Sequence, residues 1–215
     1  MSYRKYDTCF FERYAMLSLR CLLGHKFDDL FNEDRPDLQS ADHHSLGIEV
    51  TRAMEGGRDA ARKMLKNMAG ITPCSKEDSA EIQKIIDSGY GYGIQEGRYV
   101  GGLELDYWKS ARPLRDIIRS KVWKVNSGFY GSFDEFGLFV FCKDTLSEPE
   151  VADTVRFIME AQAENEKKYR RLYLSYMTDF YACNLDDDIS FEYRVTHFPV
   201  SKDLCREFYF DALEY

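Results

Sequence analysis

Hydrophobic residues in the first part of the chain recur first with the period of an α-helix and then with that of a β-strand. Residues 11–23 carry a stripe at positions i, i+3, i+4, i+7 and i+11, formed by Glu12, Ala15, Met16, Leu19 and Leu23. A carboxylate therefore heads an otherwise apolar helix face. Residues 46–51 are rich in β-branched side chains and predict a strand. In this strand Glu49 shares one face with Gly47 and Thr51, because side chains alternate between faces.

The later patterns predict alternating helices and strands. Helices are expected over residues 52–69, 76–87, 112–126 and 147 to about 167, the last opened by the capping-box sequence Ser147-Glu148-Pro149-Glu150. Strands are expected over residues 27–31, 137–142, 171–176, 180–185 and 191–196. Residues 71–110 are predicted as an insertion, in which the run Gly89-Tyr90-Gly91-Tyr92-Gly93 forms a lid, a hairpin or a plain loop. The fold class is therefore a single α/β domain over residues 1–215, with a mixed, partly parallel sheet flanked by helices.

Composition narrows the class of protein. The 215 residues are 44% hydrophobic, so the chain can bury a core without a disulfide or metal to stabilise it. Its six cysteines form no C-x-x-C pair, which excludes zinc ribbons. The N-terminus lacks the apolar core of a signal peptide, and no apolar run approaches the roughly 20 residues of a membrane helix. These features predict a cytoplasmic protein without a membrane partner.

The net charge of −8 is unevenly distributed along the sequence. Residues 52–69 hold five basic and two acidic side chains, a net +3, and residues 109–124 hold six and one, a net +5, which leaves −16 elsewhere. The two basic segments predict a local groove for a nucleic-acid backbone. Its candidate contacts are Arg58, Arg62, Lys63, Lys109, Arg112, Arg115 and Arg119. Ordinary solvated helix faces are the alternative interpretation.

Two carboxylates stand in a segment where acidic side chains are costly. Asp37 follows Pro36, which directs the chain into extended structure, and Glu49 lies twelve residues later within an apolar strand. Two like charges about 4 Å apart repel by roughly 4 kcal/mol at an effective dielectric constant near 20. A divalent cation offsets such repulsion, and hard oxygen ligands suit Mg²⁺ or Mn²⁺. Such an ion polarises a phosphodiester and acidifies its bound water.

Pro36-Asp37 and Ile48-Glu49-Val50-Thr51, preceded by a helix that bears Glu12, resemble the PD-(D/E)XK nuclease superfamily. The resemblance covers about residues 11–68 and implies a restriction-endonuclease-like αβββαβ core. It also implies that Asp37 and Glu49 bind the catalytic Mg²⁺ or Mn²⁺, with the backbone carbonyl of Val50 and the Glu12 carboxylate as further ligands. The implied activity is hydrolysis of DNA phosphodiesters, and many nucleases of this kind act as homodimers.

The chain departs from the family pattern at the motif lysine, which orients and activates the attacking water. Thr51 stands at that position, and the neighbouring Arg52 either points to the other side of a strand or already belongs to the following helix. Lys121, on the apolar stripe of the 112–126 helix, is the first candidate to replace it, and Lys63 is the second. Gln39, two residues beyond Asp37, is a candidate to position a water or a phosphate.

Each candidate also has a structural interpretation. Glu49 pairs with a nearby arginine, Asp37 accepts turn hydrogen bonds, Glu12 faces solvent, and the Lys121 stem packs while its ammonium reaches water. The His43-His44 pair and the Asp186-Asp187-Asp188 run are expected to be solvated. Two functions therefore remain: a metal-dependent DNA nuclease, or an inactive nuclease-like module that binds nucleic acid or a protein partner. A small-molecule enzyme has no supporting motif.

Overall fold

The computed structural model describes residues 8–53, 94–95, 98–99, 102–142, 145–176 and 178–214. The chain separates into two compact units, residues 1–53 with 117–215 and residues 54–116. The second unit contains a two-stranded antiparallel ladder of β4 (Ile94–Gln95) and β5 (Arg98–Tyr99). The predicted organisation, one domain with an insertion at about 71–110, stays a prediction.

A seven-stranded sheet forms the centre of the first unit. In spatial order its strands are β1 (Phe31–Asn32), β2 (Leu38–Gln39), β3 (Leu46–Ala53), β6 (Glu135–Cys142), β7 (Arg171–Tyr176), β8 (Asp179–Asn184) and β9 (Val195–Pro199). The three strands at each edge run antiparallel, whereas β3, β6 and β7 run parallel. The predicted mixed, partly parallel sheet is confirmed.

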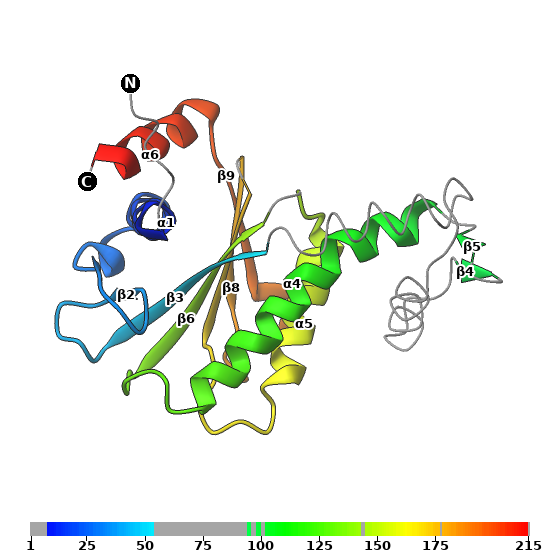
Figure 1. The fold of residues 1–215 in the computed structure, drawn as a ribbon, viewed down its shortest axis with the longest axis horizontal. Coiled ribbons are helices and arrows are strands. Elements are labelled where there is room, and N and C mark those ends of the chain that lie inside the picture. Colours follow the sequence, from blue (N-terminus) through cyan, green and yellow to red (C-terminus); the bar gives the residue numbers. More distant parts are fainter. Residues whose placement is uncertain are drawn as a thin grey trace. The chain divides into compact units, whose positions relative to one another are not determined.

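Helices cover both faces of this sheet (Figure 1). Helix α1 (Thr8–Leu23) and helix α6 (Lys202–Glu214) lie on one face. Helix α5 (Glu148–Ala161) and the C-terminal part of helix α4 (Gly102–Asn126) lie on the other. Short 3₁₀ helices η1 (His25–Phe27) and η2 (Phe191–Tyr193) precede β1 and β9. The predicted α/β class with a sheet flanked by helices is therefore confirmed.

Alternation along the central strands divides the core between the two faces. On the α1 side, the buried cluster joins helix residues such as Ala15 and Leu19 to the strand residues Ile48, Phe139 and Tyr173. Successive strand side chains point to opposite faces, so Leu138 and Leu172, also fully buried, face the α5 side. Because β6 is covered on both faces, its sequence is apolar almost throughout, as predicted.

Several expected element boundaries are wrong. The predicted strand at 27–31 is instead η1 followed by β1, because the chain turns at Gly24 with a φ of 80° and closes a 3₁₀ turn. The chain enters the strand β2 directly after Pro36 and Asp37, as expected, although Arg35 itself has a φ of 69°. The predicted strand at 191–196 is η2 followed by β9.

Helix ends differ from their predicted positions for identifiable reasons. The capping box at Ser147 and Glu150 forms as predicted, but α5 ends at Ala161 rather than Lys167. There the buried Gln162 side chain exchanges two hydrogen bonds of 2.9 Å with the Tyr169 backbone and directs the chain toward β7. Helix α4 begins ten residues before the predicted start and includes Pro113. The predicted start lies beside this proline, a residue that is common in the first turn of a helix.

The predicted helix at 52–69 begins too early, because residues 52 and 53 continue β3 beside β6. The rest of that helix, the predicted helix at 76–87 and the glycine/tyrosine run at 89–93 lie outside the described residues. None of the helices in the described part of the chain combines the length and apolar character that crossing a membrane requires.

Candidate functional site

The register of β2 and β3 places Asp37 opposite Glu49. Leu38 pairs with Ile48 and Gln39 with Gly47 in an antiparallel ladder. Continuing this ladder by one residue sets Asp37 across from Glu49, and the Cβ atoms of such directly opposed residues lie about 4.5–5.5 Å apart. Glu49 is only 5% exposed and Asp37 is half-buried. The fold therefore brings together the two carboxylates that the sequence separates by twelve positions.

Backbone groups of β3 hold Asp37 in this position. The Val50 N–H donates a 2.7 Å hydrogen bond to Oδ2 of Asp37. The side chain thus takes a place that a backbone carbonyl would take in a regular ladder. The Val50 backbone therefore adjoins the site as predicted from the resemblance, although its observed contact uses the N–H, and the ligand role of its carbonyl stays a prediction.

Close packing at Gly47 brings the Pro36-Asp37 turn onto β3. A Cβ atom at Gly47 would lie 2.7 Å from Cγ of Pro36 and 3.0 Å from Cγ of Phe133, closer than side-chain atoms approach. The buried Gln39 side chain braces the same turn, because its Nε2 donates to the carbonyl oxygen of Pro36 at 3.2 Å. Gln39 therefore supports the loop that carries Asp37, and its predicted role with water or phosphate stays a prediction.

Glu12 approaches the same group from α1. Its Oε2 accepts a 2.5 Å hydrogen bond from Nδ2 of Asn32, which also donates to the Asp37 carbonyl oxygen at 2.9 Å. Asn32 thus bridges the α1 carboxylate and the Asp37 backbone. The charge of Glu12 also raises the pKa of Asp37, though less than burial and the Glu49 carboxylate do.

Lys121 reaches the carboxylates from α4. Its Nζ donates a short hydrogen bond to Oε1 of Glu49, and the lysine side chain is only 15% exposed. Of the two lysines predicted to replace the motif lysine, Lys121 is therefore brought to Glu49, whereas Lys63 lies outside the described residues. Thr51 itself is half-buried on β3.

The electrostatics of this cluster are dominated by negative charge. Burial, followed by the charge of the Glu49 carboxylate, raises the pKa of Asp37 from its ordinary value of 3.8 to about 7. The Val50 N–H and the Lys121 ammonium act in the opposite direction without cancelling these effects. Near neutral pH, the cluster therefore binds a proton or another positive charge at Asp37.

Two tyrosines lie beneath the cluster. The Tyr130 side chain is 5% exposed, and its hydroxyl is the one buried side-chain polar atom without a hydrogen-bond partner in the described residues. Burial raises the pKa of Tyr130, as do the nearby charges of Glu49 and Asp37. The Tyr169 hydroxyl donates to the Lys121 carbonyl oxygen at 3.4 Å, and its pKa is raised chiefly by burial. Both phenols therefore remain protonated donors.

The donor set fits one class of metal ion. Among the described residues, no group of three or more His, Cys, Asp or Glu side chains is arranged to hold a metal. The opposed Asp37 and Glu49 carboxylates nevertheless match Mg²⁺, which proteins commonly hold through one or two carboxylates while waters and substrate phosphates complete the octahedron. Burial and the Glu49 carboxylate raise the pKa of Asp37, so a second negative charge at the pair is unfavourable without a compensating positive charge.

The predicted nucleic-acid contacts are only partly described. Arg58, Arg62 and Lys63 lie outside the described residues, as do the side chains of Lys109 and Arg112 on α4. Arg115 is half-buried and Arg119 is exposed on α4. The Arg119 guanidinium lies 5.4 Å from the centre of the Phe157 ring of α5. The predicted basic groove stays a prediction.

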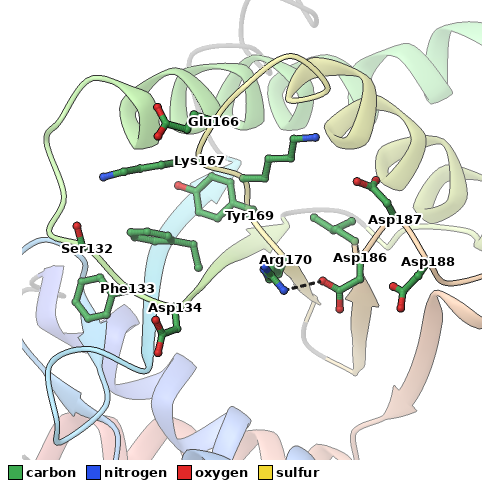
Figure 2. A pocket seen from close by; sticks show the side chains of 13 residues that line it. Ser132, Phe133, Asp134, Glu166, Lys167, Tyr169, Arg170, Asp186, Asp187 and Asp188 are labelled. Atoms are coloured by element: carbon green, nitrogen blue, oxygen red, sulfur yellow. Dashed lines mark ion pairs between the residues drawn. The ribbon is translucent and has the colours of Figure 1, made fainter.

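A pocket of about 720 Å³, whose lining does not include Asp37 or Glu49, lies near the N-terminal ends of β6 and β7 (Figure 2). Asp186, Asp187 and Asp188 line it together with Arg170 and Tyr169. Asp187 and Asp188 are exposed, as predicted, whereas Asp186 is half-buried and accepts a 2.7 Å hydrogen bond from Arg171. The expectation of a fully solvated turn is therefore wrong for Asp186, because it pairs with arginine.

Three residues of the site were not predicted from the sequence: Asn32, Tyr130 and Tyr169. Of these three, only Tyr130 could have been suspected from the sequence, because it closely follows the predicted helix that carries Lys121. The His43-His44 pair is exposed, as predicted. Nδ1 of His43 lies 3.4 Å from Oε1 of Gln39, so the pair borders the supporting loop rather than the carboxylates.

Comparison of the chain with protein-family models, curated proteins and solved structures found no match.

Proposed function

We propose that this protein is a metal-dependent nuclease that hydrolyses DNA phosphodiesters with a restriction-endonuclease-like core. The proposal rests chiefly on one observation: Asp37, Glu49 and Lys121 converge from three separate elements. A cross-strand carboxylate pair with an adjacent buried lysine has the composition of the PD-(D/E)XK site. The lysine comes from α4 and not from the strand position held by Thr51.

The order of elements supports the same assignment. Helix α1 is followed by the antiparallel strands β1, β2 and β3 and, after the residues that include β4 and β5, by α4 and the parallel strand β6. This order agrees with the αβββαβ core implied by the sequence resemblance. Glu49 lies on β3 and Asp37 immediately precedes β2, which is the placement that the resemblance implies.

Each residue has a definite role in this proposal. Asp37 and Glu49 hold Mg²⁺ or Mn²⁺, and Glu12, linked to them through Asn32, contacts the ion or its waters. The bound ion polarises the scissile phosphodiester and lowers the pKa of a bound water. The Lys121 ammonium, which now donates to Glu49, orients a water or a phosphate oxygen beside the pair. The two basic segments contact the DNA backbone, and the active form is a homodimer, as the resemblance implies.

A cleavage assay tests this function. Purified protein is incubated with plasmid, single-stranded DNA and RNA, in the presence of Mg²⁺, Mn²⁺ or EDTA. Cleavage of DNA is expected with either metal and not with EDTA, with a loss of at least about 100-fold in Glu49→Gln and Lys121→Gln. Asp187→Asn, an exposed carboxylate variant outside the cluster, is expected to retain wild-type cleavage.

An inactive nuclease-like module is the second candidate, and a specific contact favours it. The Lys121–Glu49 ion pair already neutralises one carboxylate, as a purely structural pair would, and Thr51 replaces the motif lysine. The two functions differ in the same assay. Binding of DNA without cleavage under every metal condition supports the inactive module, and cleavage that is equal in wild type and Glu49→Gln contradicts the proposed site.

A further inference from the structure

An exposed aromatic ring between two cations lies beside the carboxylate cluster. Phe129, in the loop after α4, is 42% exposed. The Arg35 guanidinium carbon lies 4.9 Å from the centre of its ring and the Lys124 ammonium nitrogen lies 4.5 Å from it. The Phe129 ring therefore contacts one cation from the loop before β2 and a second cation from α4. We call these three residues the Phe129 cluster.

The chain connects every member of the Phe129 cluster to a member of the site. Arg35 stands two residues before Asp37, and Lys124 lies one helical turn beyond Lys121 on α4. Phe129 immediately precedes Tyr130, and their rings pack edge to face with centroids 5.3 Å apart. Because Lys121 donates a hydrogen bond to Glu49 and Arg35 stands two residues before Asp37, the cluster borders the carboxylates.

The charge of the Phe129 cluster is available to a ligand. Among the described residues, Lys124 makes no ion pair, and Arg35 pairs only with its neighbour Asp34, at 3.2 Å. Both side chains of that pair are more than half exposed, so the pair contributes little stability and a stronger anion displaces it. Cation–π contact limits the rotamers of both cations, which lowers the entropy lost when they bind.

We propose that the Phe129 cluster binds the phosphodiester backbone of the nucleic acid next to the scissile phosphate, through Arg35 and Lys124. This inference rests on the proposed nuclease function and deepens it by assigning substrate contacts outside the basic segments predicted from the sequence. Phosphates are the matching ligand because two cations without a strong internal partner stand beside a site that takes phosphodiesters. The phenyl ring positions both cations and leaves an exposed edge against the strand.

The salt dependence of binding tests the proposal without requiring cleavage. Binding of a fluorescent DNA oligonucleotide, single-stranded or duplex, is measured in EDTA between 50 and 200 mM salt. Each lost phosphate contact reduces the slope of log K against log salt by about 0.7 for a single strand and 0.9 for a duplex. The double variant Arg35→Gln/Lys124→Gln is therefore expected to lower the slope by about 1.4 to 1.8, and Phe129→Leu is expected to weaken binding in the same direction.

Arg156→Gln is the matched control. The guanidinium carbon of Arg156, on α5, lies 4.6 Å from the centre of the Phe191 ring, on η2, in a comparable exposed contact. Its slope is expected to equal that of the wild type. The proposal is overturned if the slope is unchanged in Arg35→Gln/Lys124→Gln, or if the control lowers it equally. It is also overturned if the wild-type protein binds neither the single-stranded nor the duplex DNA at 50 mM salt. A lowered slope in a protein that never cleaves DNA supports the proposal and refutes only the nuclease function.

Discussion

Replacing Asp37 by asparagine removes one charge from a cluster that holds three carboxylates. In the folded protein the pKa of Asp37 is raised to about 7 from 3.8, mainly by burial and by Glu49. A difference of this size corresponds to about 4 kcal/mol once the carboxyl is ionised. Solvent reaches the half-buried side chain and screens its charge, so we expect about 2 kcal/mol in practice.

The sign of the effect depends on pH. A carboxyl group with a raised folded-state pKa favours the folded state below about pH 4, and this contribution is lost as the pH rises through 7. Asp37→Asn keeps an oxygen that accepts the Val50 N–H but carries no charge. In metal-free buffer the variant is therefore expected to be about 2 kcal/mol more stable than the wild type at pH 8, and about equal at pH 4.

Thermal unfolding in EDTA measures this difference, and about 2 kcal/mol corresponds to a rise of about 4–8 °C in Tm for a chain of this size. Adding Mn²⁺ at pH 8 is expected to raise the Tm of the wild type and to leave that of Asp37→Asn nearly unchanged. Asp187→Asn, which removes an exposed carboxylate, is expected to behave as the wild type in both buffers. A metal-free Asp37→Asn protein that is less stable than the wild type at pH 8 would refute this reasoning.

Two further substitutions test the surroundings of the site. Tyr130→Phe removes a buried hydroxyl that has no hydrogen-bond partner among the described residues, so urea unfolding should show a gain of about 1 kcal/mol, whereas a loss of similar size would mean that the hydroxyl forms a stabilising bond. Gly47→Ala places a methyl group 2.7 Å from Pro36, and we expect it to cost about 1–3 kcal/mol and to reduce Mn²⁺ affinity. Gly131→Ala, which meets only ordinary contacts, is its control, and an equal loss in both variants would contradict the close approach at Gly47.

Local patterns predicted the elements that are either strongly periodic or buried on both faces. The apolar run of β6 and the capping box of α5 were both predicted, although β6 begins at Glu135 rather than Gly137 and α5 ends at Ala161 rather than Lys167. The end of α5 depends on the Gln162 contact with Tyr169, and the end of β3 depends on pairing with β6. Neither contact can be inferred from the hydrophobic periodicity of the sequence, because each joins residues in different segments of the chain.

The residues of the candidate site could also be predicted from local sequence patterns, whereas the contacts between them could not. Glu49 is unusual because it interrupts an apolar strand, and Lys121 because it interrupts an apolar helix stripe, so each is visible in the sequence alone. Their contact spans 72 positions and depends on how α4 packs on the sheet. The positions of Asn32 and Tyr130 beside the carboxylates have the same origin, since folding alone brings a polar turn and an aromatic loop to these carboxylates.

Binding of Mn²⁺ to the purified protein is the most direct test of the carboxylate pair as a metal site. Electron paramagnetic resonance of free Mn²⁺, titrated at pH 8, measures the number of bound ions without any nucleic acid. We expect the wild type to bind Mn²⁺ at the pair, and Glu49→Gln and Asp37→Asn each to lose that site, whereas Asp187→Asn retains it. Mn²⁺ binding that is absent from the wild type, or equal in all four proteins, would contradict the account.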